Sequence, residues 1–469
     1  MHAHARAHQL PDAPDEECEV RVRICPALFA LLVAAGITAA CGDGTGPSGG
    51  DGSDVWAAAS GRYRLTYMSG AQPPWRYVDP GSSIGTDVDS VMLRLHPDGN
   101  YDITFYLHGV TNRPTYNGYW SPTDTRLTFL PKGKGSLTTG SFTDDKASIS
   151  PVAPLMPGLA FPNGPTTAFE FERAGKDTHV VDSFIQARLL ADIGFTGVAV
   201  TADGMIVAVA SVEKAFVRAT LPFQMPPPVT DGGGQPLDIA LAAGDAVAFV
   251  AEGGAGELGI FDVATGQRTG TVTIRRDVIR VLAGGNAIFA LTNDEFGRDS
   301  LFRIDAVSHE VTARVSVQAG AIAVSDDGSR VYAGSGAGVQ ELDGATLDSL
   351  RTLSIPATGR AMALSQNGAT LYIGPNGNAI EAWDLATVTR TLRISVTGGI
   401  YDIARQPGTG QLYVSRSQNT GAGSVYRINL ADPADESEYN TGGLPRRIAF
   451  TSSGNPVVAN DFGWIDVLR

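Results

Sequence analysis

One pattern of about forty residues comes round seven times between residues 194 and 469. Each copy has an apolar run, a tight glycine turn, a second apolar run, a longer loop, and a strand that ends in an acidic turn. The turn glycines lie 40 to 44 residues apart, at Gly204, Gly244, Gly285, Gly328, Gly368, Gly410 and Gly454. A fixed period of this length with several short strands per unit predicts a β-propeller, because helical repeats need apolar residues at 3.6-residue spacing.

Two kinds of turn punctuate each repeat. Asp203-Gly204 and Asn367-Gly368 supply the positive φ that a tight hairpin between the first two strands requires. The second turn places an acid three residues before a hydroxyl, and short polar side chains of this kind bond back to nearby backbone. Its copies are Asp262 to Thr265, Asp305 to Ser308, Asp343 to Thr346 and Asp384 to Thr387. We expect these acids to close turns rather than to act in catalysis.

The repeats resemble those of known bacterial propellers. The likeness is strongest over residues 331–346 and 371–387, which read VYAG followed by Leu342-Asp343 and LYIG followed by Trp383-Asp384. These copies resemble the YVTN-type repeat, and also quinoprotein-dehydrogenase-like and lactonase-like propellers. The resemblance implies an all-β, seven-bladed propeller over residues 178–469. It transfers no catalytic residue, because the shared positions are turn and core positions.

The last repeat is incomplete, since the chain stops after only its third strand, at residues 464–468. A blade without its fourth strand would expose an unpaired edge. The segment 179–186 lies just before the first repeat and has strand character. We predict that it pairs with the C-terminal strand and closes the ring.

The first forty residues read as an export signal. Arg21 and Arg23 precede an apolar run over 24–37, and Thr38-Ala39-Ala40 leads to Cys41. A basic segment, a short apolar core and small residues predict a secretory signal. The last four residues resemble the bacterial lipoprotein box, which implies lipidation of Cys41; a plain signal peptide with an incidental cysteine is the alternative. Residues 1–19 are acidic where such a signal should be basic, which suggests that translation starts later. Residues 41–56 are rich in Gly, Ser and Asp and predict a flexible tether.

A second β-rich unit without the repeat occupies residues 57–175. It begins with Gly61-Arg62-Tyr63, turns at Asp98-Gly99, and continues with Gly118-Tyr119-Trp120. This series resembles the small lipocalin-like barrels attached to bacterial lipoproteins, which implies an antiparallel β-barrel-like domain. Its aromatic positions would either line a cavity for an apolar ligand or fill the interior with their own side chains.

Composition excludes several kinds of chemistry. The formal net charge of the chain is −14 with no basic cluster, so nucleic acid is not an expected partner. The few His and Cys residues lack the local spacing of a metal site, and no nucleophile, phosphate-loop or haem motif occurs. The sequence therefore predicts no catalytic residue, no metal and no cofactor.

Propeller geometry still indicates where a binding site would lie. The loops between second and third strands and the connections between blades emerge on one face, and they are the longer loops here. Its candidate binding residues are Asp294, Glu295, Arg298, Arg360, Tyr401, Arg446 and Arg447. The acidic loop 293–299 would suit a hard cation, and Arg446-Arg447 an anion, although a merely solvated loop and a surface pair are the favoured explanations.

We therefore expect a lipid-anchored protein of the cell envelope that faces the periplasm or the exterior. Its expected role is that of a non-enzymatic scaffold for a protein or small-molecule ligand, with the membrane as partner through the lipid. The first alternative is an enzyme of the lactonase or dehydrogenase-like type, which a tight ionisable cluster at the channel mouth would favour. The second is a carrier of an apolar ligand in the N-terminal barrel.

Overall fold

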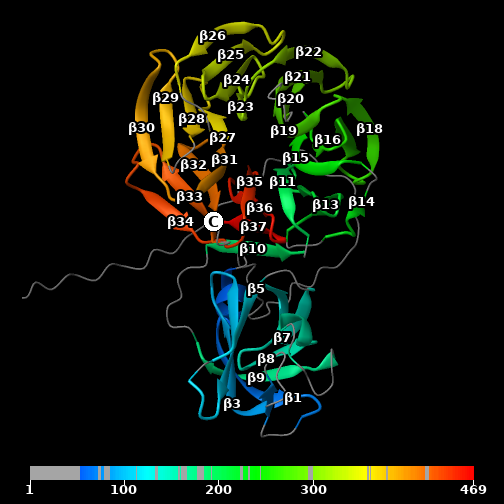
Figure 1. Cartoon of the computed structure of the whole chain (residues 1–469), viewed down its shortest axis with the longest axis vertical. Coiled ribbons are helices and arrows are strands. Elements are labelled where there is room, and N and C mark those ends of the chain that lie inside the picture. Colours follow the sequence, from blue (N-terminus) through cyan, green and yellow to red (C-terminus); the bar gives the residue numbers. More distant parts are fainter. Residues whose placement is uncertain are drawn as a thin grey trace, which may run out of the picture. The chain divides into compact units, whose positions relative to one another are not determined.

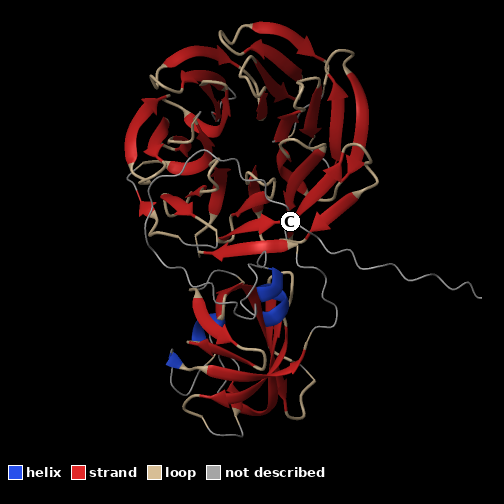
Figure 2. Ribbon diagram, turned by 180° about the vertical axis from the view of Figure 1, so that it is seen from behind, coloured by secondary structure: helices blue, strands red, loops and turns tan. Residues whose placement is uncertain are grey.

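The computed structural model describes most of the chain after residue 52. The described residues are 53–71, 75–78, 85–111, 113–132, 136–156, 159, 166–176, 184–191, 193–221, 225–230, 233–242, 244–293, 299–355, 359, 361–375, 379–417 and 422–469. Cys41, the signal and most of the predicted tether lie outside these ranges. Strands make up almost all of the regular secondary structure of the described residues (Figure 2). None of its helices has both the length and the apolar character needed to cross a membrane.

The N-terminal domain confirms the predicted antiparallel barrel, which has eight main strands and a short additional strand, β2. The strands are β1 (Gly61–Met68), β2 (Arg76–Val78), β3 (Gly85–Leu95), β4 (Asn100–Leu107), β5 (Thr115–Thr123), β6 (Arg126–Pro131), β7 (Thr138–Phe142), β8 (Lys146–Ser150) and β9 (Phe169–Gly175). Each strand from β3 to β8 pairs with the next, β1 pairs with both β9 and β3 to close the barrel, and the short β2 pairs with the first residues of β3. Full closure leaves the eight main strands without a free edge.

Aromatic side chains fill the barrel interior. Tyr63, Tyr101 and Phe129 have no exposed surface, and Tyr101 meets Phe129 edge-on at 5.3 Å. A short helix, α1 (Ser53–Ala59), and a 3₁₀ turn, η1 (Ala153–Leu155), complete the domain. Trp56 of α1 packs against Trp120 with ring centroids 4.7 Å apart. The predicted tether therefore ends before α1 and not at residue 56, because Trp56 and the alanines after it form a helix that packs on the barrel core.

The C-terminal domain is a seven-bladed propeller of four-stranded antiparallel sheets (Figure 1). Blades 1 to 3 consist of β11 (Phe195–Val200), β12 (Ile206–Ala210), β13 (Ala215–Ala219) and β14 (Val229–Thr230); β15 (Gln235–Leu241), β16 (Val247–Gly253), β17 (Glu257–Asp262) and β18 (Arg268–Thr273); and β19 (Asp277–Gly284), β20 (Ala287–Asn293), β21 (Ser300–Asp305) and β22 (Val311–Ser316). Blades 4 to 6 consist of β23 (Ala321–Val324), β24 (Arg330–Ser335), β25 (Gly338–Asp343) and β26 (Ser349–Leu353); β27 (Ala361–Leu364), β28 (Thr370–Gly374), β29 (Ala379–Asp384) and β30 (Thr389–Ser395); and β31 (Gly399–Arg405), β32 (Gln411–Ser417), β33 (Gly423–Asn429) and β34 (Glu436–Tyr439). The first strand of each blade lies nearest the centre of the ring.

Blade 7 confirms that the two ends of the propeller sequence meet. Its strands are β35 (Pro445–Phe450), β36 (Pro456–Asn460), β37 (Trp464–Leu468) and β10 (Ile185–Leu190), and β10 pairs antiparallel with β37. The predicted closing strand, 179–186, overlaps β10 at its last two residues, and the pairing continues to Leu190; residues 177–183 lie outside the described ranges. The register sets Arg188 opposite Asp466. A buried ion pair between these two side chains therefore holds β10 against β37.

The predicted turns form largely as expected. Each acid of the second turn accepts a backbone N–H from the residue three positions later, at 2.7 Å for Asp262 and Asp384, 2.8 Å for Asp305 and 3.0 Å for Asp343. The hydroxyls of Thr265 and Thr387 lower the pKa of Asp262 and Asp384 most, followed by the backbone N–H groups, and backbone N–H groups lower that of Asp305 and Asp343 most. All four acids thus make the contacts expected of residues that close turns. One turn glycine was wrong: in blade 6, Gly408 has φ +72° and takes the left-handed position that we gave to Gly410.

Candidate functional site

Among the residues that the structure describes, a β-bulge interrupts the innermost strand in five blades. Each bulge inserts one extra residue opposite the neighbouring strand and turns its side chain out of the sheet. The inserted residues are Thr196, Leu237, Ile279, Tyr401 and Arg446. All five line one cavity of about 860 Å³, which we name the vestibule. The repeat thus brings equivalent positions of five blades to a single place.

The vestibule lies on the face of the propeller that carries the longer loops. Its other walls are the end of β20, the connection before β23 and the turn between β24 and β25, which contribute Asn293, Gln318 and Ser335. Tyr401, Arg446 and Arg447, three of the predicted binding residues, line it together. Four others, Asp294, Glu295, Arg298 and Arg360, lie outside the described ranges, as does Cys41.

Four charged side chains meet just behind the bulges. In each bulged blade, the residue after the bulge lies at a fixed distance before the turn that joins the first two strands. The same distance marks an equivalent position in the other two blades. These seven positions hold Gly197, Asp238, Arg280, Ala321, Ala361, Asp402 and Arg447. The two aspartates and two arginines form a cluster that we name the quartet, and small residues occupy the other three positions.

The quartet links blades that are far apart in the sequence. Arg280 lies 2.9 Å from Asp402 and 3.4 Å from Asp238. Arg447 donates through Nε to Asp238 at 3.0 Å, and its Nη1 lies 4.0 Å from Asp402. Each carboxylate also accepts a backbone N–H from the next blade, since Val281 donates to Asp238 and Ile448 donates to Asp402. Each aspartate therefore joins three blades of the ring.

Burial and charge balance define the electrostatics of the quartet. The aspartate side chains are 4% exposed, and those of Arg280 and Arg447 are 15% and 17% exposed. Burial acts to lower the pKa of Arg280, but Asp238 and Asp402 outweigh it and raise that pKa. Burial, followed by repulsion from Arg280, lowers the pKa of Arg447 against the attraction of the same carboxylates. Both arginines stay charged because the guanidinium pKa is so high, and the quartet is neutral overall.

Arg446 is held at the vestibule by two contacts. Its guanidinium carbon lies 4.8 Å from the ring centroid of Tyr401, and its Nη2 donates to Asp461 at 2.8 Å. Such cation–π and ion-pair contacts fix the orientation of a side chain that remains partly exposed. The guanidinium of Arg446 therefore has a fixed orientation at the vestibule, and Asp461 balances its charge.

A second hollow of about 480 Å³ adjoins the vestibule and shares Asp299, Gln318, Ser335 and Ala337 with it. Ser316, Gln340 and Thr352 add uncharged hydrogen-bonding groups to its lining. The shared residues place the two hollows side by side, and we name the pair the groove; its outer part is lined by residues of blades 3 and 4. Among the described residues, no group of three or more His, Cys, Asp or Glu side chains could hold a metal ion.

Comparison with known proteins supports the fold and no narrower identity. No protein-family model matches the chain, and no curated protein matches its sequence. A chain in the crystal structure titled "Crystal Structure of Mitotic Checkpoint Complex" aligns with a TM-score of 0.51 and 13% identity, covering 61% of this chain and 91% of that one. At this identity the likeness concerns the propeller fold alone.

Proposed function

We propose that this protein is a lipid-anchored binding scaffold of the cell envelope that holds a small polar ligand in the vestibule. The carrying observation is that five bulged residues and the two quartet arginines converge on one cavity of about 860 Å³. Binding sites for small molecules are typically cavities of about 300–1,000 Å³ with a few fixed polar groups. The groove gives room for a ligand longer than the vestibule alone would hold.

The lining favours a ligand that is rich in acceptor oxygens. Arg447 uses Nε and Nη1 within the protein, which leaves its Nη2 without a partner among the described residues. An arginine carries five N–H donors in a fixed fork, so donors remain for a ligand. Because Asp238, Asp402 and Asp461 balance the three guanidinium charges, the site offers donors without a strong net positive potential. Sugar hydroxyls or amide carbonyls suit such a site better than a highly charged anion.

The quartet also bears on the enzyme alternative, since an ionisable cluster at this place is what that alternative requires. A general base needs a lone pair within reach of the substrate. Here both carboxylates already accept a guanidinium and a backbone N–H, and they lie behind the arginines and not among the lining residues. The quartet therefore serves better as a cross-link that shapes a binding site.

The barrel is better suited to packing than to carrying a ligand. Its buried Tyr101, Phe105 and Phe129 belong to one continuous core cluster, and Trp56 of α1 joins it. The anchor at the envelope rests on the sequence before residue 42 and on the tether that follows it. The proposal therefore places ligand recognition on the propeller and attachment at the other end of the chain.

A blocked vestibule tests the function. Ala337 is exposed and lines both hollows, so Ala337→Trp should fill their junction. Ala345→Trp is the matched control, because Ala345 is an exposed residue of the same blade at the acidic turn of the opposite face. A thermal-shift screen of neutral oligosaccharides, short peptides and organic acids would compare both variants with the parent protein.

A vestibule ligand should stabilise the parent and the Ala345→Trp variant but not the Ala337→Trp variant. At a hundredfold excess over its Kd, the expected stabilisation is about 2.7 kcal/mol. A screen in which every stabilising compound acts equally on all three proteins would refute the proposal. Hits confined to organic acids would refute the inferred ligand chemistry and leave the site itself standing.

A further inference from the structure

The connection between blades 6 and 7 leads directly into the vestibule. Its residues, Thr441 to Leu444, immediately precede Pro445, Arg446 and Arg447. Gly442 and Gly443 have φ of +74° and +59°, a left-handed pair that other residues rarely adopt. The position of this connection therefore determines the backbone positions of Arg446 and Arg447.

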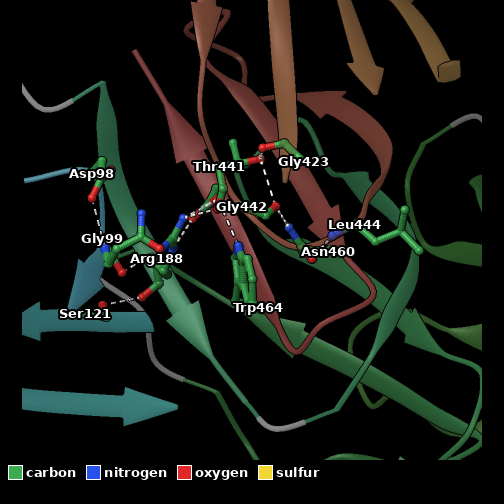
Figure 3. A network of polar contacts seen from close by, with 12 residues as sticks. Asp98, Gly99, Ser121, Arg188, Gly423, Thr441, Gly442, Leu444, Asn460 and Trp464 are labelled. Atoms are coloured by element: carbon green, nitrogen blue, oxygen red, sulfur yellow. Dashed lines mark hydrogen bonds and ion pairs between the residues drawn. The ribbon is translucent and has the colours of Figure 1, made fainter. Parts of the chain in front are cut away.

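Asn460 of β36 holds the connection at two points (Figure 3). Its Oδ1 accepts the backbone N–H of Leu444 at 2.9 Å, and its Nδ2 donates to the carbonyl of Gly442 at 2.9 Å. The next residue, Asp461, is the ion-pair partner of Arg446. The end of β36 thus holds both the connection, through Asn460, and the side chain of Arg446, through Asp461.

Arg188 of β10 ties this connection to the barrel. Its side chain is fully buried and binds both carboxylate oxygens of Asp466, at 2.6 and 2.9 Å. The same guanidinium donates to the carbonyl of Thr441 at 3.0 Å and to that of Gly99, in the β3–β4 turn of the barrel, at 3.2 Å. A buried arginine with four such acceptors has little freedom to move, because each lost bond would leave a charge or carbonyl unsatisfied.

Tyr119 of the barrel makes a second contact with the same region. Its ring centroid lies 4.1 Å from that of Trp464, whose indole N–H donates to Asp466 at 3.1 Å. A Cβ on Gly442 would lie 2.8 Å from the Tyr119 ring, so the ring and the connection are in direct contact. The barrel, the closing strand and the connection share one packed junction.

We propose that Arg188 is a positioning residue through which the docked barrel sets the geometry of Arg446 and Arg447 in the vestibule. The path runs from Gly99 through Arg188 to Thr441 and along the connection. The ligand part of this inference rests on the proposed function, whereas the positioning part does not. The barrel then acts as a support for the ligand site, beyond any role as a separate module.

Two glycines of the barrel give a matched pair of test variants. Gly99 and Gly109 both lie in turns with positive φ, +81° and +68°, so alanine strains the backbone similarly at each. A methyl group at Gly99 would lie 2.3 Å from Nη1 of Arg188, whereas one at Gly109 would meet nothing within 4 Å. Only Gly99→Ala therefore displaces the guanidinium.

Amide hydrogen exchange of the full-length protein measures the effect of each variant on residues 441–447, and it needs no ligand. We expect amides of residues 441–447 to exchange about tenfold faster in Gly99→Ala than in the parent or in Gly109→Ala, with blade 3 unchanged in all three. Equal exchange over 441–447 in the three proteins would overturn the positioning role. If Gly99→Ala does not fold, Arg188→Lys provides the comparison, because a lysine keeps a positive charge beside Asp466 but lacks the fork that reaches Gly99 and Thr441 at the same time.

A vestibule ligand from the blocking screen extends the test. Its Kd should rise several-fold in Gly99→Ala and stay unchanged in Gly109→Ala, and an unchanged Kd in both would refute the coupling to the ligand site. If the screen finds no vestibule ligand, the proposed function fails, while hydrogen exchange still decides on the positioning role.

Discussion

Asp238→Asn tests whether the quartet holds the propeller together. Asparagine keeps the shape of the side chain and an oxygen that can accept the backbone N–H of Val281, so the variant removes the charge and little else. Arg447 loses the carboxylate at 3.0 Å and retains Asp402 only at 4.0 Å. Arg280 keeps its closer partner, Asp402, at 2.9 Å.

The expected cost follows from this uneven compensation. Removing one partner of a buried ion pair costs about 3–5 kcal/mol, because the remaining charge stays buried and uncompensated. Since Asp402 still lies near both arginines, the loss for Asp238→Asn should fall at the lower end, about 3 kcal/mol. The double variant with Asp402→Asn should lose more than the sum of the single losses, because neither arginine then has a carboxylate.

Guanidinium denaturation followed by far-ultraviolet circular dichroism and by tryptophan fluorescence measures this loss. With an m-value of about 5 kcal/mol/M, a loss of about 3 kcal/mol moves the midpoint down by about 0.6 M. Asp461→Asn is the control, because its pair with Arg446 is partly exposed, at 24% and 31%, and should contribute less than about 1 kcal/mol. Equal small shifts for Asp238→Asn and Asp461→Asn would refute the structural role of the quartet.

Three further predictions concern the turns and the anchor. Hydrogen bonds from Ser325 and from the Ser329 backbone lower the pKa of Asp327 to about 2, so its contribution to stability is present above the unfolded pKa, near 4, and is lost as the pH falls towards 2. Asp327→Asn should keep the turn, as Asn367 does with the same contacts in the next blade, and should flatten the acid-unfolding curve between pH 4 and 2; an unchanged slope would contradict this. Gly408→Ala should cost about 1 kcal/mol in urea denaturation and Gly410→Ala much less, because only Gly408 has positive φ, and equal losses would count against the blade 6 turn. Intact-mass analysis in a bacterial host should find a chain that starts at Cys41 with added acyl groups, absent from Cys41→Ser, whereas an unmodified product would remove the anchor.

The local parts of the fold were predictable from the sequence because they depend on residues close together in the chain. A two-residue turn needs a positive φ, and an acid three residues before a hydroxyl closes its own turn, as Asp262 and Thr265 do. The closure of blade 7 was predictable for a different reason, since a missing fourth strand must come from elsewhere. Its position was not, because Arg188 fixes the register through a partner 278 residues away.

The quartet escaped sequence analysis for the same reason. From the sequence, we identified Arg447 as a candidate binding residue on the loop face. We identified none of Asp238, Arg280 and Asp402. Their contacts span 122 residues between Arg280 and Asp402 and 209 between Arg447 and Asp238. A signal was nevertheless present: Leu237-Asp238-Ile239-Ala240, Ile279-Arg280-Val281-Leu282 and Tyr401-Asp402-Ile403-Ala404 each place one charge at the same position of an otherwise uncharged, largely apolar run. Aligning the repeats by their first strands and asking which copies break the apolar rule would have found it.

Broken symmetry explains why a binding site arises at one part of the ring. Seven identical blades would place seven identical residues at the centre, where like charges would repel. Here the charged residues come as two Asp–Arg pairs in neighbouring blades, separated by small residues, so the long side chains meet in opposite-charge contacts. Blade 4 has an innermost strand of only four residues, whose described pairing shows no bulge, and the groove extends from the vestibule between blades 3 and 4. The blades that carry bulges and charges thus supply most of the vestibule lining, and the groove leaves it beside blade 4, whose innermost strand carries neither.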